Sequence, residues 1–309
     1  MKQRWALLVV DVQRDFCPGG ALPASGCDRI IPVINRYLAD ARERGMPIYA
    51  SRDWHPEVTD HFAPYGGQWP PHCVQESPGA EFDPALQLPP DAIVVNKGAE
   101  PTRPGYSAFD GHTLDGRSFA DSLRECGIDA LSIAGIATEY CVKLTALDAR
   151  RAGLRVNVLT DAIAGIEQQP GDVRRALAEL SDAGAHLGTE LRPVDVVLLA
   201  VDWQSRAPLR AQLIEEGYEV VATDAWPAAR RALRPGIKQQ LLFVDLKDLP
   251  DADRVLDDLE ILMKTDRVLV LTSLGTIPAS ELERRGFHVI RRPVAVDDIV
   301  SAIANLRST

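Results

Sequence analysis

Long apolar runs are missing from this sequence. Trp5–Val10 is too short for the apolar core of a secretory signal, and Asp11 closes it without a small-residue cleavage pattern. No other stretch approaches the length of a membrane span. We therefore expect a cytoplasmic protein with no membrane partner.

Basic residues are also in deficit. The chain has 34 Lys and Arg against 44 Asp and Glu, which gives a formal net charge of -10 at pH 7. Nucleic acids and anionic membranes attract clustered Lys and Arg. The charge balance therefore argues against a nucleic-acid partner.

Cysteine is scarce, and its number is odd. The five cysteines, at positions 17, 27, 73, 126 and 141, show no paired framework. Domains that depend on disulfides are usually small, secreted and dense in cysteine. We expect free thiols and a reducing compartment.

What the chain does have is an alternation of short apolar runs with segments of helical period. This pattern predicts an α/β fold in which helical crossovers join the strands of a parallel sheet. The 309 residues suffice for two domains, and the pattern restarts near Leu191–Val194, so we predict domains at 1–192 and 193–309. In the first domain the predicted strands are 6–10, 47–51, 92–96, 130–134, 156–159 and 185–188, and the predicted helices are 28–44, 118–126, 138–152 and 171–183.

The second, smaller domain shows five consecutive strand–helix units. Such a repeat is typical of a flavodoxin-like (βα)5 fold. Its predicted strands are 196–200, 219–222, 241–244, 268–271 and 288–290, and its predicted helices are 207–216, 226–233, 251–263, 279–285 and 296–306.

Polar or nucleophilic residues follow four predicted strands of the first domain, namely Asp11, Asp53, Lys97 and Cys141. Ligands and catalytic groups gather at the carboxyl ends of parallel strands. Cys141 falls in the first turn of a predicted helix, where Thr138 is the expected N-cap and the helix dipole favours a thiolate. Lys97 would lower the thiol pKa further, and Asp11 would take and return the proton. Each residue alone has an ordinary structural explanation, but their joint placement predicts a cysteine nucleophile.

Three of the six histidines, His55, His61 and His72, lie in one irregular stretch rich in Pro and Gly, residues 53–90. Asp53 and His55 leave a strand on the same side, because side chains alternate in extended chain. A carboxylate with three imidazoles suits zinc, iron or manganese. Surface histidines on a loop are the alternative. We predict one divalent transition metal, with zinc preferred over iron or manganese.

Six segments also carry a resemblance to a known family. They are Asp11–Gly20 (DVQRDFCPGG), Asp53–Pro56 (DWHP), Trp69–Cys73 (WPPHC), Asn96–Gly98 (NKG), Tyr106–Phe109 (YSAF) and Gly135–Val142 (GIATEYCV). In this order and spacing, residues 4–190 resemble the nicotinamidases and pyrazinamidases of the isochorismatase-like cysteine hydrolase superfamily. The resemblance implies the parallel, Rossmann-like sheet of that superfamily.

The resemblance also implies roles for particular residues. The implied catalytic triad is Asp11, Lys97 and Cys141. A cis peptide bond between Ile136 and Ala137 would aim the backbone N–H groups of Ala137 and Cys141 into an oxyanion hole. The implied metal ligands are Asp53, His55, His61 and His72. Phe16, Trp69 and Tyr106 match positions that line the family's aromatic substrate pocket, although ordinary core aromatics are the alternative.

The reaction implied by the resemblance is hydrolysis of nicotinamide, and by extension pyrazinamide, to the acid and ammonia. It needs a small-molecule amide and the metal, but no nucleotide or flavin. Two alternatives remain at this point: a related hydrolase acting on another small amide or carbamoyl compound, and a signalling scaffold that binds the ligand without turnover.

The second domain resembles a response-regulator receiver domain with defects. Asp245 ends its third strand where the phosphoacceptor belongs, Thr272 ends the fourth, and Arg292 stands where a lysine is usual. The acidic pair of receivers is reduced to Asp202, because Trp203 follows it. Since phosphoryl transfer to aspartate needs Mg²⁺ held by these carboxylates, we expect Asp245 to stay unphosphorylated. The domain would then act by contact, for example by forming a homo-oligomer.

Overall fold

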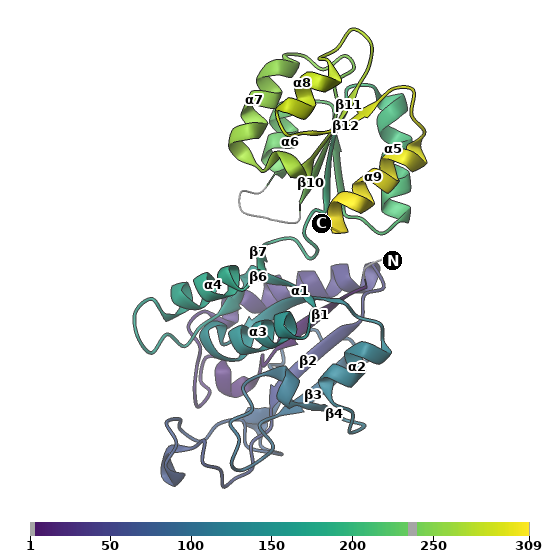
Figure 1. Cartoon of the computed structure of the whole chain (residues 1–309). Helices are drawn as coiled ribbons and strands as arrows, with labels where there is room; N and C mark the ends of the chain where they lie inside the picture. The colour runs from purple at the N-terminus through teal and green to yellow at the C-terminus, as the bar shows by residue number, and fades with distance from the viewer. Residues whose placement is uncertain (1–3, 234–239, 309) are drawn as a thin grey trace. The chain divides into compact units, whose positions relative to one another are not determined.

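The computed structural model of the chain describes residues 4–233 and 240–308 and divides into two units, each built on its own sheet (Figure 1). One unit ends at Pro193 and the other begins at Val194. No helix in these described ranges is both long and apolar enough to cross a membrane.

The sheet of the first unit has seven strands in the order β4-β3-β2-β1-β5-β6-β7. All neighbouring strands are parallel except β4, which pairs with β3 in the antiparallel sense. The central strand β1 reads WALLVV and is buried along its whole length, as expected for a strand covered on both faces. The strands are β1 (Trp5–Val10), β2 (Ile48–Asp53), β3 (Ile93–Lys97), β4 (His112–Thr113), β5 (Ala130–Ile136), β6 (Arg155–Ala164) and β7 (His186–Gly188).

The six strands predicted for this unit are confirmed, and two features differ from the prediction. Strand β4 was missed, because two residues are too few to show a periodic pattern. Strand β6 runs on to Ala164, beyond the predicted end at 159, because the exposed Thr160 and Asp161 interrupt its apolar run without ending the pairing with β5.

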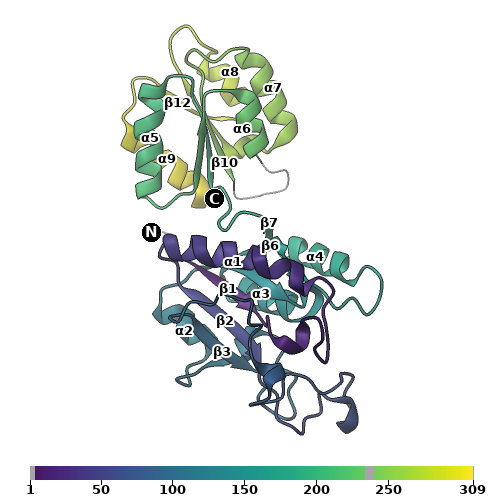
Figure 2. The ribbon, with the colours of Figure 1, turned by 180° about the vertical axis from the view of Figure 1, so that it is seen from behind.

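Helices cover both faces of this sheet (Figures 1 and 2). Helix α1 (Cys27–Glu43) buries seven side chains, including Ile30, Ile34 and Leu38, in the core on one face. The core on the other face takes side chains from α2 (Phe119–Glu125), α3 (Lys143–Arg151) and α4 (Asp172–Asp182). Single turns of 3-10 helix lie at Arg14–Phe16, Ala63–Tyr65, Pro78–Ala80 and Ala108–Asp110.

The second unit is a five-stranded, fully parallel sheet in the order β12-β11-β10-β8-β9. In chain order this is the doubly wound 2-1-3-4-5 arrangement. Its strands are β8 (Val196–Leu199), β9 (Val220–Thr223), β10 (Leu241–Asp245), β11 (Val268–Thr272) and β12 (His288–Arg291). Helices α6 (Trp226–Ala232), α7 (Ala252–Leu262) and α8 (Ala279–Arg284) pack on one face, and α5 (Trp203–Glu215) and α9 (Val296–Ser308) on the other, with a 3-10 turn at Thr265–Arg267.

Two cysteines form a disulfide, so the expectation of five free thiols is wrong. Cys17 and Cys27 are bridged across a Cα–Cα distance of 5.3 Å, while Cys73, Cys126 and Cys141 are free. The chain between the bridged residues folds back on itself, and the Ala24 N–H donates to the Phe16 carbonyl at 2.9 Å. That reversal brings the two thiols together, and the spacing of cysteines along the sequence does not reveal it.

Gly135 allows β5 to lie close against β1. Its φ is +118°, and a Cβ built there would lie 2.1 Å from the carbonyl oxygen of Val10. Both the backbone conformation and the close approach of the Val10 carbonyl therefore require glycine at this position. The next residues, Ile136 and Ala137, begin the turn that carries Cys141.

We expect Gly135→Ala to destabilise the first unit by about 3 kcal/mol or more, because strain and a clash with immovable backbone combine. Gly153→Ala is the matched control: Gly153 also has a positive φ, of +85°, but a Cβ there meets nothing within 4 Å. It should cost only about 1 kcal/mol. Urea unfolding followed by circular dichroism measures both, and equal losses would contradict the packing argument.

Candidate active site and metal centre

Four neighbouring strands deliver polar side chains to one edge of the first sheet. Lys97 is the last residue of β3, Asp53 is the last residue of β2, and Asp11 directly follows β1. Cys141 lies in a π-helical turn, Thr138–Val142, directly after β5. All four residues are at most 5% exposed. We call these four residues the polar cluster.

The Lys97 ammonium joins the members of the polar cluster. Its Nζ lies 2.8 Å from Asp11 Oδ2, 2.5 Å from Asp53 Oδ1 and 3.4 Å from Cys141 Sγ. Burial by itself lowers the pKa of Lys97, but the two carboxylates outweigh it and raise that pKa well above its ordinary value. The amine is therefore charged, and its charge is matched inside the protein.

The two carboxylates of the polar cluster differ in their proton affinity. Burial raises the pKa of Asp11 to about 6 despite the nearby Lys97, which places its titration close to neutral pH. Burial also acts to raise the pKa of Asp53, but Lys97 and His55 outweigh it and hold that pKa well below its usual range. Ser51 Oγ donates to Asp11 Oδ1 at 2.8 Å, which favours the ionised form of Asp11.

Burial acts against the lowering of the Cys141 pKa that Lys97 was expected to cause. Burial raises the pKa of Cys141 well above its ordinary value, and this effect exceeds the opposing charge of Lys97. Thr138 was predicted to be the N-cap of the helical segment that carries Cys141, and this prediction is wrong. The N-cap residue is Ala137, with no side-chain cap, and the Thr138 hydroxyl is buried without a hydrogen-bond partner among the described residues.

The backbone around Cys141 has the conformation that the family resemblance implies. The peptide bond between Ile136 and Ala137 is cis. Ala137 and Cys141 belong to one turn, which is closed by the Val142 N–H donating to the Ala137 carbonyl at 3.1 Å. The two residues predicted to form an oxyanion hole are therefore neighbours in space.

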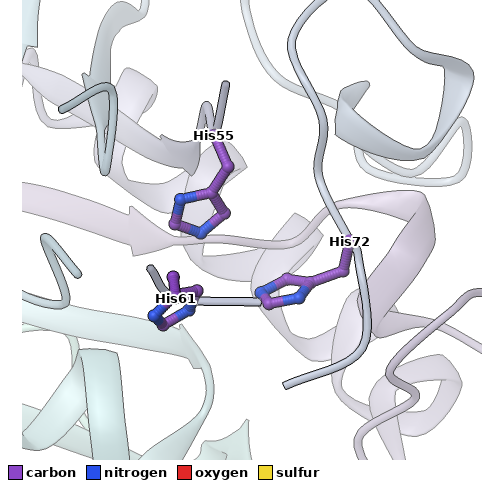
Figure 3. Close-up of side chains that lie close together, drawn as sticks. All are labelled: His55, His61 and His72. Atoms are coloured by element: carbon purple, nitrogen blue, oxygen red, sulfur yellow. The ribbon is translucent and has the colours of Figure 1, made fainter. Parts of the chain in front are cut away.

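The rings of His55, His61 and His72 converge on one another (Figure 3). Their centroids lie 4.6 Å apart for His55 and His61, 5.2 Å for His55 and His72, and 5.4 Å for His61 and His72. One ring nitrogen from each lies within 4.8 Å of the others. The three come from the irregular stretch between β2 and β3, so this loop brings the three predicted imidazole ligands together.

The chemistry of these imidazoles fits a metal ion. The Nε2 atom of His55 is buried with no hydrogen-bond partner among the described residues, while its Nδ1 lies 3.0 Å from the Gly98 carbonyl. Such a backbone contact orients a ligating imidazole. Burial lowers the pKa of His61 to about 3 and also lowers that of His72, which favours the neutral form that metal ligands need. Asp53 Oδ2 lies 3.7 Å from His55 Nε2, on the same side as the rings.

The three aromatic residues predicted to line a pocket surround the histidines. The Phe16 ring lies 5.4 Å from His72, and the Tyr106 ring lies 5.3 Å from His61. Trp69 Nε1 donates to the Tyr106 hydroxyl at 2.8 Å. A hollow of about 380 Å³ opens beside His61 and Tyr106.

Sequence reasoning missed two neighbours of the site. Tyr140 packs 5.1 Å from Trp69 and 5.8 Å from Tyr106 between ring centroids, and we call these three residues and Phe16 the aromatic wall. The place of Tyr140 next to Cys141 was an unused signal. Gln13 holds the backbone of Asp53: its Oε1 accepts from the Asp53 N–H, and its Nε2 donates to the Asp53 carbonyl, each at 2.8 Å. Gln13 lies two residues after Asp11, but no pattern in the sequence pairs it with Asp53.

The corresponding edge of the second unit holds carboxylates that are already engaged. Asp245, at the end of β10, is buried, and its Oδ2 lies 2.5 Å from Arg292 Nη2. Asp202 caps α5 by accepting from the Gln204 N–H at 3.0 Å, and its other oxygen lies 3.4 Å from Lys247 Nζ. This cap also explains why α5 begins at residue 203, earlier than predicted.

Comparison with known proteins gives a consistent result for the first unit. The isochorismatase domain family matches residues 5–190. The chain is 44% identical over 200 residues to the nicotinamidase of Escherichia coli (strain K12), covering 60% of this chain and 94% of that protein. It is similar to the zinc complex of the pyrazinamidase of Pyrococcus horikoshii, with 47% identity, a TM-score of 0.56 and coverage of 60% of this chain and 99% of that one.

A further similar structure is that of PnC1 from L. infantum in complex with nicotinate, with 33% identity, a TM-score of 0.52 and coverage of 60% of this chain and 94% of that one. The domain match extends over more than half of the residues. The chain therefore belongs to the isochorismatase domain family.

Proposed function

We propose that the first unit hydrolyses nicotinamide to nicotinate and ammonia and accepts pyrazinamide as a second substrate. The observation that carries this proposal is the contact of buried Lys97 with both Asp11 and Cys141, next to the three converging imidazoles. The similarity to nicotinamidases and to a nicotinate complex supports the choice of substrate. The aromatic wall suits a flat heteroaromatic ring.

In the proposed mechanism, Asp11 is the proton carrier. Its raised pKa of about 6 leaves it ionised at neutral pH but basic enough to take a proton. As the Cys141 sulfur bonds to the carboxamide carbon, the thiol proton passes to Asp11. The C–N bond then breaks, and Asp11 returns that proton to the departing ammonia. Asp11 next deprotonates the water that cleaves the thioester, which releases nicotinate and the free thiol.

Lys97 and the turn that carries Cys141 stabilise the charge that develops during these steps. The Lys97 ammonium faces both the proton carrier and the sulfur, so it favours the ionised state of each. The N–H groups of Ala137 and Cys141 would receive the oxyanion of the tetrahedral intermediate. A divalent transition ion held by His55, His61, His72 and Asp53 would supply a Lewis-acidic centre that binds the ring nitrogen and orients the amide.

Cys141→Ala should reduce ammonia release from nicotinamide by at least about 10³-fold, because no other residue can form the thioester. Cys126→Ala is the control, since Cys126 is a free cysteine outside the polar cluster, and it should keep full activity. Mass spectrometry of rapidly quenched wild-type enzyme should show the nicotinoyl adduct on Cys141. More than about a per cent of activity in Cys141→Ala would contradict the covalent mechanism. If the wild-type protein released ammonia from another small amide but not from nicotinamide, only the proposed substrate would be wrong.

The acid limb of kcat/KM should follow Asp11, with activity lost as the pH falls through about 6 and the proton carrier becomes neutral. Ser51→Ala removes the hydrogen bond that favours ionised Asp11, so the limb should move to higher pH, by about 0.5 unit. Ser132→Ala is the control, because this buried serine donates to the Leu191 carbonyl instead. An unmoved limb in Ser51→Ala would show that another group sets the profile.

For the second unit we propose a role by contact, without phosphoryl transfer. Arg292 already neutralises Asp245, and Asp202 serves as a helix cap, so too few free carboxylate oxygens are left for Mg²⁺. Incubation with acetyl phosphate and Mg²⁺ should leave the mass of the full chain unchanged. Stoichiometric addition of one phosphoryl group that disappears in Asp245→Asn would overturn this proposal and favour a receiver-like switch.

A further inference from the structure

The polar cluster contains a second set of metal-type ligands, separate from the histidines. Asp11, Asp53 and Cys141 each offer one ligand atom, these atoms lie within 4.8 Å of one another, and all three residues are buried. Carboxylate oxygens together with a thiolate sulfur form a donor set that zinc and related ions accept. The Nζ atom of Lys97 contacts all three residues.

The ammonium group of Lys97 occupies the position that a metal ion bound by Asp11, Asp53 and Cys141 would take. Its distances of 2.8 and 2.5 Å to the carboxylate oxygens and 3.4 Å to the sulfur exceed metal–ligand bond lengths of about 2.1 and 2.3 Å by no more than about 1 Å. Rotation of the three side chains could supply that difference. A positive charge at this position is already required, because two buried carboxylates face it.

Asp53 places this position next to the histidine centre. Its Oδ1 contacts Lys97, while its Oδ2 lies 3.7 Å from His55 Nε2. Pairs of metal ions in proteins lie about 3.5–4 Å apart, a spacing that one carboxylate can bridge. Without the lysine, the ligands on both sides of Asp53 would suit a pair of ions.

We propose that Lys97 is the resident cation of a latent second metal site and that it keeps this site free of metal, so that the Cys141 sulfur stays available as a nucleophile. A sulfur bound to a transition ion shares its electron pair with that ion and attacks carbon poorly. The inference rests on the proposed metal binding at His55, His61 and His72. It adds the exclusion of a metal ion, by occupation of its position, to the charge-stabilising role of Lys97.

Metal stoichiometry tests the proposal on the full-length chain. Wild-type protein freed of metal and titrated with excess Co²⁺ should bind one ion, as counted by native mass spectrometry, and show no near-ultraviolet thiolate-to-cobalt charge-transfer band. Lys97→Ala should bind two ions and gain that band. A second ion with the band in the wild type, or a single ion in folded Lys97→Ala, would overturn the proposal.

Three variants act as controls on the origin of the second ion. Lys97→Met removes the charge but fills the space, so it should bind one ion without the band. The double variant Lys97→Ala with Cys141→Ala should lose the band, because the sulfur is its source. His55→Ala should lose the first ion from an otherwise wild-type chain, which separates the two sites.

Two measurements keep the test decisive if Lys97→Ala is poorly stable. Excess Zn²⁺ should raise the Tm of Lys97→Ala more than that of the wild type, because an added ion replaces the missing charge. Zn²⁺ should also slow alkylation of Cys141 by iodoacetamide at least about tenfold in Lys97→Ala and leave the wild type unaffected. Equal responses of the two proteins would refute the exclusion role. None of these readouts uses nicotinamide, so failure of the proposed reaction would be seen separately.

Discussion

A buried ammonium between two buried carboxylates is the interaction on which the first unit depends. A charge at this depth must be paired, because removing one partner of such a group costs about 3–5 kcal/mol. Lys97 can reach Asp11 and Asp53 only if β1, β2 and β3 are adjacent and end at the same level. Pairing these buried charges therefore requires this order of strands, and the same order places the polar side chains together.

Asp53 extends that constraint from the nucleophile to the metal centre. One of its oxygens balances Lys97, and the other faces the histidines, while Gln13 fixes its backbone from both sides. The histidines themselves come from a long irregular stretch, which a compact domain tolerates when its backbone is used for a site. One carboxylate thus contacts both Lys97 of the polar cluster and the nearest histidine.

Burial and the local path of the chain account for the points at which the structure departs from the sequence-based expectations. Cys141 has the neighbours that were predicted, but its pKa rises because desolvation outweighs the charge of Lys97. Cys17 and Cys27 were expected to be free, yet a chain reversal places them within bonding distance. Thr138 was expected to cap a helix, whereas the chain enters that helix through a π-helical turn. Each outcome depends on packing between segments that are remote or irregular in sequence.

The sequence by itself determined the alternation of strands and helices in both units and the residues that stand at the strand ends, because apolar periodicity and chain order are local properties. It also indicated which loop would carry the histidines. Only the tertiary structure decided that Lys97 contacts three cluster members at once, that Ser51 and Gln13 hold the two carboxylates, and that Arg292 neutralises Asp245. Those contacts join residues that are 40 or more positions apart, so no helical or strand periodicity in the sequence reveals them. Their energies also depend on exclusion from water.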